Sequence, residues 1–243
     1  MSRALKNTFV LGAVAAAALV AAPANAAVTI TGTGAGTTLT TSGASGGSAA
    51  LDFNGFGGSP VTVIAGLTAK LTLSFASIVG NTFNFGYTLE NTSSTPITAS
   101  RISSFGFNVD PNISSASSTG TFDFATVDNS GINIPNVGNV EVCFKDVNTG
   151  TCTGNGGGLD FGQSATGTLA LAFSSPQTAI SLSNFYVRYL SLEGAGVIQS
   201  ASGQVTSPVP EPAAWMLMIL GFAGIGFAMR RQRYTHTARV RFV

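Results

Sequence analysis

Apolar and polar residues alternate along much of the chain between residues 27 and 205. Each run carries leucine, valine or aromatic side chains on one face and serine, threonine or asparagine on the other, which is typical of half-buried β-strands. Clusters of glycine, proline, asparagine and serine separate the runs and favour turns, and no run keeps a 3.6-residue period. We therefore expect an all-β domain over 27–205, an antiparallel β-sandwich or jelly roll. The positions expected to face its core are Leu71, Leu73, Phe75, Phe83, Phe85, Tyr87, Leu89, Phe105, Phe107, Val109, Phe122, Phe124, Val140, Val142, Phe144, Leu169, Leu171, Phe173, Ile180 and Leu182.

Two stretches interrupt this pattern early in the domain. The segment "GTGAGTTLTTSGASGGSAA" has few side chains able to pack, so its latter part, Gly43 to Ala50, is predicted to be a loose loop. The cluster "NGFGGSP", which begins at Asn54, is predicted to separate two strands.

The first 26 residues have the layout of a secretory signal peptide. Arg3 and Lys6 precede an apolar stretch over 9–22, and a small-x-small cleavage pattern ends at Ala26, so the mature chain is expected to begin at Ala27. The Sec translocon and signal peptidase are then partners. The alternative, an uncleaved anchor helix, needs about 20 apolar residues, more than this stretch offers.

The chain near its other end contains 17 uncharged residues, 213–229, with Trp215 near their start. A helix of this length is about 25 Å long, at the short limit for crossing a bilayer. Basic residues follow and predict a cytoplasmic tail over 230–243 by the positive-inside rule. The alternative, a buried core helix, fits poorly with this arginine-rich end. The stop consists of Arg230, Arg231 and Arg233, and the helix contains Gly221, Gly224 and Gly226, a small-residue surface that another membrane helix can approach.

A proline-rich linker over 206–212 joins the β-domain to this helix. Pro208, Pro210 and Pro212 favour extended backbone and prevent the helix from starting earlier. Glu211 is therefore presented in accessible backbone beside the membrane, as a processing enzyme requires.

The order of Pro210-Glu211-Pro212, Trp215, apolar glycine-containing helix and arginine stop resembles a PEP-CTERM sorting signal, and "PEPAAW" resembles its PEP-x-x-W variety. This resemblance implies recognition and cleavage by exosortase, an integral-membrane cysteine transpeptidase. It implies a single-pass precursor in the inner membrane of a Gram-negative bacterium and then delivery to the cell surface or exopolysaccharide matrix. "SRISSFGFNV", "VEVCFK", the Gly156-Gly157-Gly158 run and "NFYVRYLSLEG" are similar to the cistern family of PEP-CTERM proteins, a resemblance that implies no mechanism.

The charge of the predicted β-domain argues against nucleic acid as a partner. It contains nine acidic residues and only four basic ones, Lys70, Arg101, Lys145 and Arg188, and so carries a net charge of about −5. Binding to a phosphate backbone needs several cationic contacts.

Cys143 and Cys152 are the only cysteines and flank the turn-forming sequence Asn148-Thr149-Gly150. In an oxidising compartment a hairpin here would bring them within bridging distance. We expect them to form a disulfide bond.

The residue inventory favours a non-enzymatic protein without a cofactor. The single histidine, His236, lies in the predicted tail, which excludes histidine-based triads and zinc sites from the exported part. Asp123, Asp128 and Asp160 could in principle serve glycoside hydrolysis, but their spacing selects no pair.

Two stretches resemble parts of calcium-binding motifs, and neither motif is complete, so no metal is expected. Asp146 and Asn148 begin an EF-hand-like series, but Thr151 stands where the loop needs glycine. "NGGGLDF" around Asp160 is one imperfect turn of a glycine-aspartate β-roll, which cannot stack alone.

The leading hypothesis is that the chain is a surface or matrix protein. Two alternatives in which it binds a ligand stay open. Tyr186 and Tyr189 are candidates for stacking on the sugar rings of exopolysaccharide, although a tyrosine in an alternating strand is more often a core residue. Thr31, Thr33, Thr38 and Thr40 are spaced as in short threonine ladders of ice-binding proteins, although two pairs do not make an array.

Overall fold

The computed structural model describes residues 28–206, apart from residues 33, 43–45 and 155. The predicted signal peptide, linker motif, transmembrane helix and basic tail lie outside these residues, as does Thr33. The site predictions that fall there are Ala26, Ala27, Pro210, Glu211, Pro212, Trp215, Gly221, Gly224, Gly226, Arg230, Arg231 and Arg233.

The described residues form thirteen strands and one 3-10 turn, and every strand pairing is antiparallel. An all-β antiparallel fold is thus confirmed. The elements are β1 (Val28–Thr31), η1 (Gly34–Gly36), β2 (Thr38–Ser42), β3 (Ser48–Gly57), β4 (Thr62–Val79), β5 (Thr82–Glu90), β6 (Ala99–Asp110), β7 (Ser115–Ser118), β8 (Phe124–Ile134), β9 (Gly138–Lys145), β10 (Leu159–Asp160), β11 (Ser164–Ala172), β12 (Ala179–Glu193) and β13 (Ala201–Val205).

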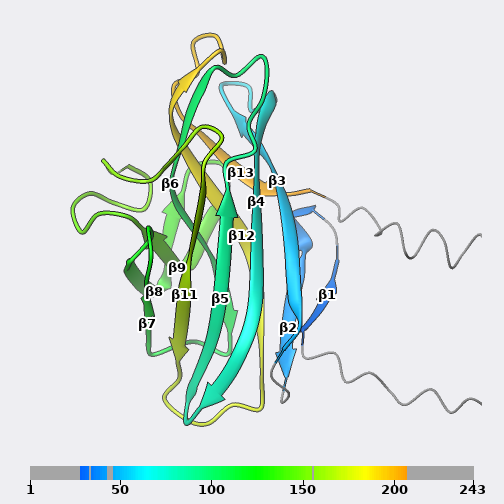
Figure 1. Ribbon diagram of the computed structural model, residues 1–243, viewed down its shortest axis with the longest axis vertical. Coiled ribbons are helices and arrows are strands. Elements are labelled where there is room, and N and C mark those ends of the chain that lie inside the picture. Colours follow the sequence, from blue (N-terminus) through cyan, green and yellow to red (C-terminus); the bar gives the residue numbers. More distant parts are fainter. Residues whose placement is uncertain (1–27, 33, 43–45, 155, 207–243) are drawn as a thin grey trace, which may run out of the picture.

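The strands belong to one sheet that curls around a single core (Figure 1). Its order is β7-β11-β5-β4-β3-β13-β12-β6-β9-β8, and the end strands β7 and β8 contact one another, so the sheet is nearly closed. The two layers expected of a sandwich are therefore two sides of one sheet. Closure in this way leaves few free strand edges.

The long strand β12 determines where the two ends of the domain lie. Its first part, Ala179–Leu182, pairs with β2, and its later part, Tyr186–Tyr189, pairs with β13 on the same edge. The strand β13 therefore ends at the point along β12 where the pairing with β2 begins. The strand β1 pairs with β2. Both the start of β1 and the end of β13 lie on the side of the domain formed by β1, β2 and β3 (Figure 1).

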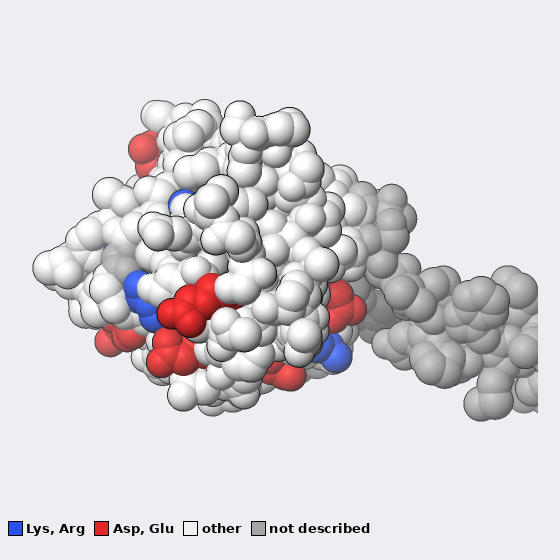
Figure 2. Space-filling view, turned by 90° about the horizontal axis from the view of Figure 1, so that it is seen from above, with Lys and Arg blue, Asp and Glu red and all other residues white. Residues whose placement is uncertain are grey.

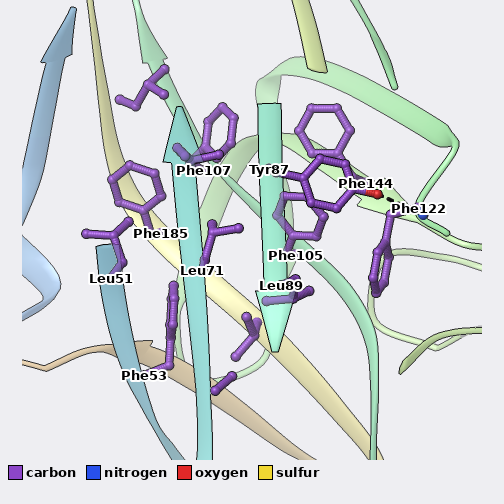
Figure 3. Close-up of a cluster of buried hydrophobic side chains, with 14 of the residues drawn as sticks. Leu51, Phe53, Leu71, Tyr87, Leu89, Phe105, Phe107, Phe122, Phe144 and Phe185 are labelled. Carbon is purple, nitrogen blue, oxygen red and sulfur yellow. Dashed lines mark hydrogen bonds between the residues drawn. The ribbon is translucent and has the colours of Figure 1, made fainter. Parts of the chain in front are cut away.

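The core is rich in phenylalanine, as the alternating pattern predicts. Figure 3 shows rings from β5, β6, β9 and β12 meeting between the two sides of the sheet. The Phe105 ring lies 5.2 Å from Phe144 and 5.3 Å from both Tyr87 and Phe122, measured between centroids. Each such ring contributes about 2–3 kcal/mol by burial, and these offset and edge-on arrangements add to it.

One predicted core residue enters the core from a turn and not from a strand. Phe122 is fully buried but precedes β8, in a turn held by Tyr87. The Tyr87 hydroxyl donates to the Thr119 carbonyl at 3.1 Å and accepts from the Phe122 amide at 3.3 Å (Figure 3). Burial raises the pKa of this phenol above its ordinary value, which keeps it protonated as a donor.

The prediction of a loose loop over Gly43–Ala50 is wrong in its last part, whereas "NGFGGSP" does separate two strands, because its last three residues form the turn between β3 and β4. Ser48–Ala50 belongs to β3 and not to a loose loop, and Ala49, Leu51 and Phe53 face the core with at most 2% exposure. The same strand runs through Asn54–Gly57, within the predicted separator. Gly55 is needed there for packing, since a Cβ at this position would lie 2.3 Å from Cδ2 of Leu67.

Candidate functional site

The loop that follows β9, Asp146–Gly158, is fastened to the outer face of the sheet, and we call it the clamped loop. The predicted disulfide bond between Cys143 and Cys152 is confirmed. Both cysteines are buried, in a small second cluster with Ile134, Val140 and Tyr186 that lies apart from the main core. The bond closes a nine-residue separation and ties the middle of the loop to β9.

Lys145 binds the first half of the clamped loop from within. Its side chain is only 7% exposed, and its ammonium donates to the carbonyl oxygens of Asn148 at 3.2 Å and Gly150 at 2.8 Å. Carbonyl oxygens that would otherwise point into the loop are thereby satisfied, as buried polar groups require.

Arg188 binds the second half from the neighbouring strand β12. It is also 7% exposed; Nε donates to the Thr153 carbonyl at 3.1 Å, and the terminal nitrogens donate to Ser202 Oγ and Ser200 Oγ at 3.3 and 3.0 Å. Burial lowers the pKa of this guanidinium from its ordinary value. All three acceptors are uncharged, so Arg188 joins the loop to β13 without using a carboxylate.

Arg101 and Asp146 close the end of the clamped loop. The Arg101 guanidinium donates to the Gly157 carbonyl, and the Asp146 carboxylate accepts from the Gly158 amide at 2.7 Å. The carboxylate considered for calcium thus orders its own loop. Among the described residues, no three His, Cys, Asp or Glu side chains gather closely enough to hold a metal ion.

Three of the four basic side chains in the described residues therefore bind carbonyls of one loop. Sequence reasoning missed this role of Arg101, Lys145 and Arg188. The only available signal was their scarcity. A solvated surface usually carries many basic residues, so a domain with only four of them tends to use each one in a specific contact. The result is a rigid loop that presents glycine backbone and the hydroxyls of Thr149 and Thr151 to solvent.

Tyr186 and Tyr189 are buried, as is usual for tyrosines of alternating strands, so these two candidates are not available for sugar stacking. Both side chains are 0% exposed. Tyr186 lies beneath the clamped loop, with its hydroxyl 3.5 Å from Ser104 Oγ, and Tyr189 lies in the main core with no hydrogen-bond partner for its hydroxyl. Burial raises the pKa of both phenols well above the ordinary value. Both faces of β12 are covered here, one by the main core and the other by the disulfide cluster beneath the clamped loop.

Phe161 is the only exposed aromatic residue of the described part of the chain, with 39% of its surface exposed. It directly follows Asp160, which lies opposite Arg101 in the β10–β6 pairing. The turn that carries the ring is held by the Gly162 amide, which donates to the Asn91 carbonyl at 3.1 Å. An exposed ring beside a carboxylate and an arginine is the chemistry that sugar rings contact.

The three carboxylates considered for glycoside hydrolysis lie on separate elements. Asp160 ends β10, Asp128 accepts from the Ser130 amide at 2.9 Å within an irregular part of β8, and Asp123 precedes that strand. A pocket of about 380 Å³ at the β12–β13 hairpin contains one carboxylate, that of Glu193. Hydrolysis of this kind uses two.

Of the predicted threonines, Thr31, Thr38 and Thr40 lie on the small β1–β2 ribbon. Thr31 lies opposite Thr38 and Thr29 opposite Thr40, with Thr29 and Thr31 exposed. Thr40 Oγ1 lies 3.3 Å from Ser181 Oγ on β12. The described part of this ladder therefore contains two cross-strand threonine pairs. Ice binding uses a much longer regular array.

The end of the described chain is fixed to the sheet. Thr206 donates to the Asp52 carbonyl from its amide at 2.8 Å and from its hydroxyl at 3.2 Å. Thr206, the last described residue, is therefore held by the fold two positions before Pro208.

A comparison with known protein families matches residues 208–232 to the PEP-CTERM protein-sorting motif. The chain carries a PEP-CTERM signal. The match contains the predicted motif residues Pro210, Glu211, Pro212 and Trp215. It ends at residue 232 and so includes Arg230 and Arg231 but not Arg233. The signal implies exosortase as processing partner and export to the cell surface through a membrane-anchored precursor. The narrower resemblance to the cistern family stays a prediction.

None of the curated proteins or solved structures compared with the chain is significantly similar to it. The part of the chain that the structure describes, within residues 28–206, contains no helix long and apolar enough to cross a membrane.

Proposed function

We propose that this PEP-CTERM protein is a non-enzymatic protein of the cell surface or extracellular matrix, with the β-domain as its exported cargo. Sec translocation and signal peptidase deliver the domain across the inner membrane of a Gram-negative cell. Exosortase then cuts close to Glu211 and releases the domain from its anchor. The absence of histidine from residues 27–212 and the separation of the acidic side chains support a role without catalysis.

The position of Thr206 carries this proposal. The domain is completed by the hydrogen bonds of Thr206 to Asp52, and the matched motif begins two residues later. Cleavage near Glu211 therefore leaves in place all the strands, core residues and clamped-loop residues that the structure describes. The product keeps the whole fold, as a protein that works after release requires.

The C-terminus of the mature protein tests this proposal. Intact-mass measurement of material recovered from the cell surface or medium should give a chain that starts at Ala27 and ends between Ser207 and Ala213. Surface material that still contains Arg230 or later residues would contradict processing at this motif.

Contact with exopolysaccharide is a second candidate function, and the exposed ring of Phe161 favours it. We expect Phe161→Ala to weaken retardation of the purified β-domain in affinity electrophoresis through the cell's own polysaccharide, because the stacking surface is lost. Val197→Ala is the control, since Val197 is an apolar residue 97% exposed on another loop. Equal mobility of Phe161→Ala and the unaltered domain would exclude this ring as a sugar contact.

A further inference from the structure

The distance between the domain and the membrane is limited by very few residues. Seven residue steps separate Thr206, which is fixed to β3, from residue 213, where the uncharged segment begins. A fully extended chain of this length spans about 25 Å. The headgroup layer on one side of a bilayer occupies about 5–7 Å of that distance. Thr206 must therefore stay close to the membrane surface while the anchor is attached.

This limit selects one side of the domain. In the strand order, β3 and β13 are in the middle, whereas β7 and β8 are the two ends that meet. In a nearly closed sheet the middle lies opposite the meeting point, and Figure 1 shows β1, β2 and β3 on one side and β7, β8 and β9 on the other. Two layers about 10 Å apart, with outward side chains, make a body about 20 Å thick. A chain of about 25 Å cannot pass around that body and also cross the headgroups.

The chemistry of the selected side fits a phospholipid surface. The strands β1, β2 and β3 contain a single charged residue, Asp52, and it lies opposite Lys70 of β4. Their outward positions are mostly threonine, serine and asparagine. The opposite half, from β6 to the clamped loop, contains the five carboxylates of Asp110, Asp123, Asp128, Glu141 and Asp146. Anionic lipids repel carboxylates and accept hydrogen bonds from hydroxyls and amides.

We infer that, in the membrane-anchored precursor, the side formed by β1, β2 and β3 lies against the phospholipid headgroups, with β7, β8 and the clamped loop pointing away from the membrane. The inference rests on the proposed function, because it needs the anchor. It adds an orientation that the sorting motif alone does not define. The clamped loop is then the part of the precursor most accessible to other molecules.

The test uses the full precursor in vesicles of phosphatidylethanolamine and phosphatidylglycerol, without exosortase. A single cysteine bearing a fluorophore replaces either Asn54 on β3 or Ser117 on β7, both exposed strand positions. The native cysteines are joined to one another and do not react. With a nitroxide quencher on the lipid headgroups, the Asn54→Cys label should lose most of its fluorescence and the Ser117→Cys label should keep it.

The outcomes separate this inference from the proposed function. Equal quenching of the two labels, or stronger quenching at residue 117, overturns the orientation. A precursor that does not float with the vesicles contradicts the anchor, and with it the proposed function. Selective quenching that appears only when exosortase is added shows that the partner of this side is the enzyme, and the headgroup proposal is then wrong.

A longer linker between Thr206 and the membrane segment tests whether the short linker causes the orientation. About 20 glycine and serine residues inserted after Ser207 add about 25 Å of flexible reach. The difference between the two labels should then shrink, because the domain can turn freely. A difference that survives the insertion contradicts the short tether as its origin.

Discussion

Replacing Pro210, Glu211 and Pro212 together with alanine is expected to leave the protein in the membrane at the mass of its anchored precursor. The two prolines fix φ and hold the segment extended, and the glutamate supplies its only charge. Alanine favours helix, so the membrane helix could extend backward toward Thr206 and remove the accessible backbone. Immunoblots of membrane and surface fractions measure the result, which should be close to all-or-none.

The control for this replacement is Pro208→Ala, which changes a proline of the same linker outside the Pro-Glu-Pro triplet. It should leave processing nearly normal. Normal surface delivery and normal mass of the triple variant would contradict recognition of the triplet. Loss of processing in Pro208→Ala as well would show that general stiffness of the linker, and not the triplet, is recognised.

Gly158→Ala is expected to destabilise the domain by about 2–5 kcal/mol, the largest effect we expect from a single methyl group in the clamped loop. Gly158 has φ of 135°, a conformation that other residues adopt only with strain. A Cβ there would lie 2.1 Å from the carbonyl oxygen of Ile102, so β10 would have to move away from β6. The free energy of unfolding in urea measures the loss.

Gly156→Ala is the matched control from the same glycine run. A Cβ at Gly156 would meet no atom within 4 Å, so this substitution should change stability by only a few tenths of a kcal/mol. Similar unfolding free energies for both variants would show that the end of the clamped loop does not hold β10 in place.

The strands of this domain were predictable because burial of one apolar face offsets the conformational entropy that each strand loses on folding. Leu71, Leu73 and Phe75 on β4, or Phe83 and Phe85 on β5, alternate strictly with polar residues, and all five are buried. Glycine misled the prediction in β3, because Gly55 serves packing there and not a turn.

Other features depend on contacts between distant segments, which the local pattern does not contain. Nothing near Tyr186 in the sequence indicates that a loop after β9 covers it, so the sequence does not show how this tyrosine is buried. The curling of one sheet until β7 meets β8 likewise follows from register and bulges across many pairings. The disulfide bond could be predicted from the sequence because both cysteines flank one turn.

Lys145 and Arg188 lie buried beneath the clamped loop, so the charged side chains on the outer surface of the domain are mainly acidic. This affects the electrostatic force between neighbouring copies of the domain. Of the basic residues in the described chain, only Lys70 and Arg101 keep a partly accessible side chain, against nine carboxylates. Crowded copies would therefore repel like charged colloidal particles, with a range of about 8 Å at physiological ionic strength and about 30 Å at 0.01 M. The spacing and water content of a dense coat of these molecules would swell in fresh water and contract in brine.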